Sequence, residues 1–316
     1  MNKDTNFLKF LTKNKWAVWL MILVITIIWG YAWVLMKLSL NYMGAFTFSA
    51  FRFAVGSITL LLIVWVSKKG VPPKSMWKHL IILGILQTSI VFLLVMYGLR
   101  FVDAGKSSVL LYSMPLWSSI FAAKYLGEKI TPAKTTGLLI GMLGLLTIMG
   151  WDIWIGQSIE VIIGEVLIIL AAVSWGIANV YYRLKLQDIP KLQSSAYQMI
   201  FGTIGIIIAT LFMEWGEPVE LNVDSIYYIL FTGVFASALC FTIWFFILSI
   251  IDMVTATLAT LLVPIFGLLF SWLILGERFT VGITAGSTLI IIGIIIAQVK
   301  NRSVGKIRKT RHSPRP

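Results

Sequence analysis

Few residues of this chain have the types and placement that catalysis needs. Both histidines lie outside the apolar runs, His79 at a boundary and His312 near the end of the chain. The one cysteine, Cys240, lies inside an apolar run, so a disulfide framework, a thiolate metal cluster and a two-cysteine redox motif are excluded within one chain. A membrane transferase or protease would need His, Asp or Cys grouped within the membrane. We therefore expect no enzyme, no metal site and no cofactor.

Charged residues inside or at the ends of apolar runs are the candidates for binding or for proton transfer. Arg52 lies about two turns from the outer end of its run, so its side chain can reach the membrane surface. It is either part of a structural pair or headgroup contact, or it captures a substrate carboxylate. Glu165 is the only carboxylate inside a run and lies about one turn from its start, where it can satisfy a helix N-terminus, carry a proton or pair with Lys37 or Arg52. Lys37 ends its own run, a position typical of interfacial anchors.

Aromatic residues and one amide also lie deep in the apolar runs. Trp29 and Trp33 share a helix face because they are four residues apart. Trp175 lies about 14 residues, roughly 20 Å along a helix, from the outer end of its run, so an interfacial belt does not account for it. Asn179 follows one turn later on the same face. Together with Tyr112, these residues either pack in the core or line a pocket for an amphipathic substrate.

Two prolines interrupt apolar runs at matching places, Pro115 and Pro264. Each removes a backbone donor and frees a carbonyl in the preceding turn. A freed carbonyl is costly in lipid unless it faces a cavity or a neighbouring helix. We expect each proline to be a packing kink or a gate beside a substrate.

The composition indicates that lipid, not water, surrounds these apolar runs. Hydrophobic residues make up 59% of the chain and charged residues 12%, with 13 Trp in 316 positions, more apolar surface than a soluble core can bury. The sequence therefore predicts an all-α integral membrane protein. The net charge of +13 does not indicate a nucleic-acid partner, because the basic residues lie between apolar runs and in a tail rather than on one soluble face.

Apolar runs of about 20 residues, the length of a membrane-spanning helix, predict ten transmembrane helices, of which only two hold a charge well inside, Arg52 and Glu165. The first is too long for a signal-peptide core and has no cleavage site, so we expect it to remain. The predicted spans cover residues 17–36, 45–66, 80–99, 107–123, 133–150, 161–182, 193–213, 225–247, 254–273 and 280–299.

The second half of the chain repeats the first. Trp29-Gly30 recurs 146 residues later as Trp175-Gly176, and after a shift in a loop Pro115 recurs 149 residues later as Pro264. This duplication predicts a first five-helix repeat at 17–150 and a second at 161–299, typical of secondary transporters whose substrate path lies between the halves.

Basic residues predict the orientation of these repeats. If both termini are cytoplasmic, most Lys and Arg fall in the cytoplasmic segments. Plasma-membrane proteins carry an excess of Lys and Arg in their cytoplasmic loops, so we expect this orientation. Five spans are an odd number, so the two repeats are inverted. Residues 1–16 are expected to form a cytoplasmic interfacial segment, and 300–316 a basic disordered tail drawn to membrane lipid.

Several motifs, in order and duplicated, resemble those of the EamA-type ten-helix exporters of the drug/metabolite transporter superfamily. They are Trp29-Gly30, Arg52-Phe53, Gly127-Glu128-Lys129, Gly164-Glu165 and Gly276-Glu277-Arg278. The resemblance implies two inverted repeats around a cavity lined mainly by spans one, three, four, six, eight and nine. The run Tyr112-Ser113-Met114-Pro115 is similar to the Tyr-Leu-Trp-Pro run of aromatic amino acid exporters, with Met114 in place of the indole.

These observations favour a secondary transporter that exports small amphipathic metabolites, such as amino acids or related compounds and drugs, by alternating access. No nucleotide-binding motif is present, which excludes self-contained ATP-driven pumping. The alternative is a flippase for lipid headgroups, or a passive facilitator, with a wide lateral opening lined by Arg52 and Lys37. Gly-xxx-Gly pairs in spans five and ten favour close helix packing, within the chain or in a homodimer.

Overall fold

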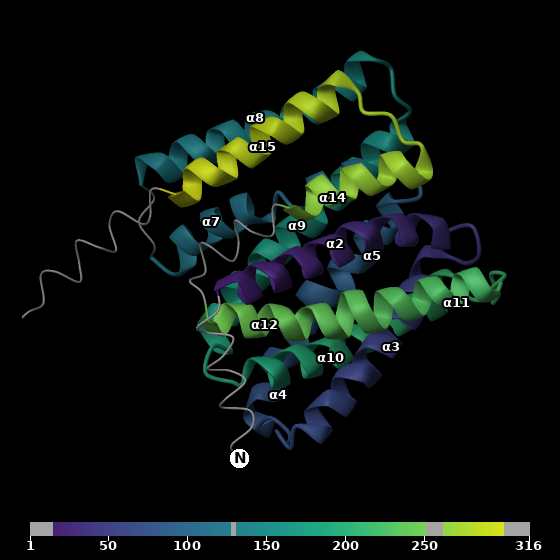
Figure 1. The fold of residues 1–316 in the computed structure, drawn as a ribbon, viewed down its shortest axis with the longest axis vertical. Helices are drawn as coiled ribbons and strands as arrows, with labels where there is room; N and C mark the ends of the chain where they lie inside the picture. Colours follow the sequence, from purple (N-terminus) through teal and green to yellow (C-terminus); the bar gives the residue numbers. More distant parts are fainter. Residues whose placement is uncertain (1–14, 128–130, 251–261, 300–316) are drawn as a thin grey trace, which may run out of the picture.

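The computed structural model describes residues 15–127, 131–250 and 262–299, and within these ranges the chain forms helices and turns but no strand (Figure 1). The expected basic tail at 300–316 lies outside the described residues, as does nearly all of the interfacial segment at 1–16.

Helices follow one another through both halves of the chain. The first half contains α2 (Lys15–Ser39), α3 (Ala45–Val66), η1 (Lys74–Met76), α4 (Trp77–Gly84), η2 (Ile85–Ile90), α5 (Val91–Gly98), α6 (Ala104–Leu111), α7 (Met114–Tyr125) and α8 (Pro132–Trp154). The second contains α9 (Ile159–Lys185), α10 (Lys191–Met213), α11 (Val223–Leu230), η3 (Phe231–Leu239), α12 (Cys240–Ile250), α14 (Leu262–Phe270), η4 (Ser271–Leu275) and α15 (Val281–Val299).

Length and composition suit many of these helices to a bilayer. Six helical stretches within the described ranges are long and apolar enough to cross a membrane, and shorter apolar helices accompany them. Large apolar side chains point outward along the helices; Trp65 is 77% exposed and Leu139 is 62% exposed. In water such a surface would aggregate, whereas lipid covers it without cost. The protein is therefore an integral membrane protein.

Two stretches depart from regular α-helix at related places. Ile85–Ile90 between α4 and α5, and Phe231–Leu239 between α11 and α12, are π-helical. A shift of 149 residues places the first stretch inside the second. Such bulges alter the i→i−4 hydrogen-bond pattern and are frequent at functional sites.

The chain also breaks between α6 and α7. The break lies at Tyr112 and Ser113, and Pro115 is the second residue of α7. A proline in the first turn loses no helical hydrogen bond. Pro115 therefore starts a new helix rather than kinking a continuous one. Pro264 is buried near the start of α14, which follows the undescribed residues 251–261.

Helices from the two halves pack in pairs. Figure 1 shows α8 and α15 side by side along one edge, with α3, α4 and α10 at the opposite edge. Glycines allow the first pair to approach closely, because a Cβ on Gly144 would lie 2.7 Å from the carbonyl oxygen of Gly286, and one on Gly293 would lie 2.5 Å from that of Gly137. The glycine stripes of spans five and ten thus serve packing within the chain.

The α3–α10 pair is tied at its centre and at both ends. The hydroxyl groups of Ser57 and Thr203, which are equivalent in the repeat, lie 2.9 Å apart. At one end the Glu214 carboxylate accepts from the backbone N–H groups of Phe46 and Thr47, at 3.0 and 2.7 Å, and so caps α3. At the other end Gln193 donates to the carbonyls that follow α3.

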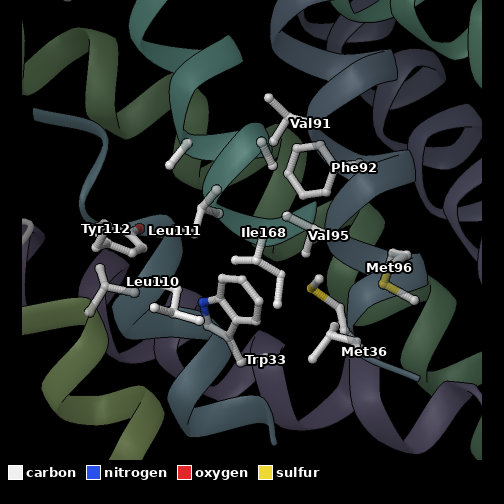
Figure 2. Packing of buried hydrophobic residues seen from close by; sticks show 14 of the residues in the cluster. Trp33, Met36, Val91, Phe92, Val95, Met96, Leu110, Leu111, Tyr112 and Ile168 are labelled. Atoms are coloured by element: carbon white, nitrogen blue, oxygen red, sulfur yellow. The ribbon is translucent and has the colours of Figure 1, made fainter. Parts of the chain in front are cut away.

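A continuous apolar core joins these helices. Figure 2 shows residues of α2, α5, α6 and α9 converging, with Trp33 and Met36 facing Val95 and Ile168. Trp33 is 5% exposed, and Val95 and Ile168 are fully buried. The core lies beside the main cavity and fixes the helices that line it.

Candidate functional site

One cavity of about 350 Å³ lies among the helices of both halves. Residues of α2, α3, α4, η2, α5, α6, α7, α9, α10 and α12 line it, and most of its wall is apolar. At one end the lining residues Met36 and Arg52 are buried, whereas at the other end Tyr182 and Arg183 are partly exposed. The aromatic lining residues are Trp29, Trp33, Phe92, Tyr112, Trp175, Tyr182, Phe241 and Trp244.

Seven of the ten residues singled out by sequence lie around this cavity. The proposed substrate residues all line it, as do Pro115 and Arg52, whereas Lys37, Glu165 and Pro264 are not among its described lining residues. The proposed substrate residues are Trp29, Trp33, Tyr112, Trp175 and Asn179. The resemblance implied little contribution from spans two and seven, yet α3 and α10 contribute to the wall.

Two tryptophans face the cavity in matching surroundings. The rings of Trp29 and Phe241 are 6.0 Å apart between centroids, and those of Trp175 and Phe92 are 6.2 Å apart. Both partners of the first contact are the repeat equivalents of the partners of the second. The indole of Trp29 also donates to the carbonyl of Ala236 at 2.8 Å, within the π-helical stretch η3. A π-helix leaves carbonyls open to such donors.

The remaining candidates supply polarity to the same wall. Asn179 donates from Nδ2 to the Ser118 hydroxyl at 3.3 Å, which orients its amide. Tyr112 is 8% exposed and occupies the break between α6 and α7. The cavity thus offers aromatic surface with a few oriented polar groups, the composition usual for small-molecule sites.

Arg52 lies at the buried end of the cavity and is 4% exposed. Its Nε donates to the Ser237 hydroxyl at 3.2 Å, and its Nη1 lies 2.9 Å from the sulfur of Met36. The guanidinium carbon is 5.0 Å from the ring centre of Phe53 and 4.9 Å from that of Phe92. Burial rules out the reach to the membrane surface that its position in the sequence suggested.

Gln198, the repeat equivalent of Arg52, also lines the cavity. Its Oε1 accepts a hydrogen bond from Thr88 at 2.9 Å, and Thr88 is the repeat equivalent of Ser237. The same pair of helix positions therefore carries a cation in one half and a neutral amide in the other.

Glu165 pairs with Lys106, not with Lys37 or Arg52. Its Oε1 is 2.7 Å from the Lys106 ammonium, and the two side chains are 0% and 5% exposed. Lys37 instead donates to the carbonyls of Leu99 and Val102, at 2.5 and 2.8 Å, beyond the end of α5. Lys106 directly precedes the span predicted at 107–123, but α6 begins at Ala104 and buries this lysine.

Two acidic residues that the sequence analysis gave no role prove to be caps. Glu277 accepts from the backbone N–H groups of Ala104 and Gly105, at 2.7 and 3.0 Å, at the start of α6. Gly276 before it adopts φ 67°, and its repeat equivalent Gly127 adopts φ 64°. The duplicated Gly-Glu pairs signalled this turn, since only glycine takes that conformation freely. Glu214, the cap of α3, had no such signal.

A membrane-embedded bundle with an aromatic cavity between its two halves has the architecture of a membrane transporter. The EamA-like transporter family model matches the chain twice, over residues 15–150 and 162–298, and the chain belongs to this family. It is 34% identical over 281 residues to the uncharacterized transporter YoaV of Bacillus subtilis, covering 88% of this chain and 96% of that protein.

More distant relatives are also transporters by name. A probable amino-acid metabolite efflux pump of Salmonella typhimurium is 22% identical over 282 residues, covering 87% of this chain and 92% of that protein. A crystal structure matches with a TM-score of 0.66 at 17% identity, covering 91% of this chain and 97% of that one, which supports the fold.

Proposed function

We propose that the protein is a secondary transporter that exports small amphipathic metabolites, such as amino acids or related compounds, across the plasma membrane. The observation that carries the proposal is the aromatic cavity lined from both halves of the chain. The name of the Salmonella relative agrees with this cargo. The protein acts as a carrier and not as an enzyme, since no described lining residue is a histidine, an aspartate or a glutamate.

In this proposal the chain crosses the membrane ten times, as two inverted repeats of five spans with both termini in the cytoplasm. Repeat-related contacts support the inversion, namely the Trp29–Phe241 and Trp175–Phe92 ring contacts and the Ser57–Thr203 bond between equivalent residues. With this orientation, the partly exposed end of the cavity, at Arg183, faces the cytoplasm. The structure then corresponds to an inward-facing state, ready to take up cargo for export.

The flippase alternative required Arg52 and Lys37 to line one lateral opening. Lys37 is instead bonded to two backbone carbonyls, and Arg52 is buried at the end of the cavity. This arrangement favours a soluble metabolite over a lipid headgroup.

Reconstitution into liposomes followed by a counterflow screen across amino acids, amines and common drugs tests the transport proposal. Trp175→Ala removes a cavity wall and is expected to abolish counterflow while expression persists. Trp65→Ala, at a position 77% exposed on the outer surface of α3, is the matched control and should transport normally. Equal transport by both variants, or counterflow of none of the compounds, would refute the proposal.

The topology is tested by labelling single cysteines in a Cys240→Ser background. A cysteine introduced between residues 214 and 224 should react with an impermeant reagent from outside intact cells. Reaction only after the inner face is opened contradicts the orientation.

A further inference from the structure

Within the described residues the buried guanidinium of Arg52 has no carboxylate partner. No carboxylate lies within ion-pair distance of it in the described ranges, and its contacts there are a hydroxyl, a thioether sulfur and two aromatic rings. Thioether sulfur is a weak hydrogen-bond acceptor, so replacing the Met36 sulfur by a carboxylate oxygen as the partner of Nη1 loses little interaction energy. A buried cation without an anionic partner is costly, and an arriving anion removes that cost.

Three acids of the described helices already have partners of their own. Glu165 is paired with Lys106, Glu277 caps α6 and Glu214 caps α3. None of them lines the cavity. Among the described lining residues the charged groups are Arg52 and Arg183, both cationic. Arg52 therefore faces no carboxylate among the described lining residues, and low-dielectric walls strengthen the field of its charge.

Building on the proposed transport function, we propose that the cavity selects amphipathic organic anions, with the carboxylate of the cargo on Arg52 and its apolar body against the aromatic wall. The guanidinium fork suits a carboxylate, since it can donate two parallel hydrogen bonds. Trp33, Phe92 and Tyr112 line the adjoining wall and accommodate a ring or a branched chain.

The charge of the cargo sets the expected order of binding. A monoanion satisfies Arg52 and brings no further charge into the cavity. A zwitterion also brings an ammonium group, which meets aromatic rings and the amides of Asn179 and Gln198 but no described carboxylate. An amine brings a positive charge to the Arg52 cation and carries no carboxylate to pair with it. Binding should therefore weaken from anion to zwitterion to amine.

Calorimetric binding to the full-length protein in detergent tests this order with three probes that share a phenyl ring: phenylpyruvate, phenylalanine and 2-phenylethylamine. Phenylpyruvate should bind at least about tenfold more tightly than the amine, the scale of one charge-assisted hydrogen-bond pair. Equal or tighter binding of the amine overturns the proposal.

Variants at one position assign the discrimination to Arg52. Arg52→Gln copies the amide found at the equivalent position 198 and should bring the ratio of anion to amine affinity close to one. Arg52→Lys keeps the charge and should keep the preference with weaker binding. Arg100→Gln removes an exposed positive charge away from the cavity and should leave the ratio unchanged. A ratio is independent of the fraction of folded protein, so partial misfolding does not obscure it.

The two proposals fail in different ways. If none of the probes binds but the liposome screen finds counterflow of another metabolite, the anion proposal is overturned and transport stands. An unchanged affinity ratio in Arg52→Gln has the same meaning. If no compound shows counterflow, the transport proposal itself fails.

Discussion

The two halves of the cavity share a framework but differ in charge at one pair of equivalent positions, Arg52 and Gln198. Arg52 bonds to Ser237 across one helix pair, and Gln198 bonds to Thr88 across the equivalent pair. Ring contacts of the two tryptophans match in the same way. The backbone arrangement is thus repeated, whereas the polar groups that meet a cargo are not. Repetition supplies the scaffold, and selectivity is set by the positions at which the halves have diverged.

The Lys106–Glu165 pair is the second point of divergence. Its repeat equivalents in the sequence are Thr255 and Trp19, which cannot form an ion pair. The pair joins α6 of the first half to α9 of the second. Because the equivalent positions carry no charged pair in the sequence, the contribution of this ion pair is specific to one of the two repeat-related contacts.

The largest predicted effect comes from breaking that pair. Glu165→Leu or Lys106→Met alone should lower the free energy of unfolding by about 4 kcal/mol, because each breaks a 2.7 Å ion pair between buried side chains. The double variant should be close to the natural protein. Unfolding in mixed micelles, followed by tryptophan fluorescence, measures all three. Two single variants within 1 kcal/mol of the natural protein would show that the pair contributes little.

Close backbone contacts give the next effect. A Cβ on Gly84 would lie 2.4 Å from the carbonyl oxygen of Gln198, and one on the equivalent Gly233 would lie 2.8 Å from that of Arg52. We expect Gly84→Ala and Gly233→Ala each to cost about 3 kcal/mol, since backbone must move. Gly150→Ala, with nothing within 4 Å of its Cβ, should be neutral or stabilising in the same assay. Unequal costs at Gly84 and Gly233 would show that the framework is less symmetric than its contacts.

Substituting the two equivalent tryptophans should change the stability of the protein by different, more moderate amounts. Trp29→Phe removes the donor to the Ala236 carbonyl and should cost about 2 kcal/mol. Trp175→Phe keeps an aromatic ring against Phe92 and should cost less, because no hydrogen bond of its indole occurs within the described ranges. Thermal unfolding of both variants side by side checks the difference. A larger loss at Trp175 would reverse the assignment of the structural role.

The smallest effect is expected at the contact between equivalent residues. Ser57→Ala removes one hydrogen bond to Thr203, which still donates to the Met199 carbonyl, so the cost should be about 1 kcal/mol. The control is Thr147→Val, because the Thr147 hydroxyl donates to the Leu143 carbonyl of its own helix. This variant should not measurably lower the free energy of unfolding. A loss of several kcal/mol at Ser57 would mean that this contact controls the whole α3–α10 pair.

Sequence reasoning predicted the membrane helices and the aromatic residues around the cavity, because helices in lipid need long apolar runs and the duplication repeats the same motifs in both halves. It missed the partner of Glu165, since Lys106 lies near a helix start, where hydropathy does not show which way a side chain turns. It also missed the π-helical stretches, whose residues differ in no periodic way from those of an α-helix. The sequence predicted Pro115 to be a packing kink or a gate inside one span, because a proline does not reveal whether a helix passes through it or begins there.

Glu277 makes the two halves dependent on each other during folding. It belongs to the second repeat, yet its carboxylate completes the first turn of α6 in the first repeat. Glu214, also from the second repeat, does the same for α3. If the gene were divided in the loop around Gly156, the N-terminal product would be synthesised with two helix starts unsatisfied and would need the other product as an assembly partner. Because both halves are encoded in one chain, each first half is synthesised together with one second half.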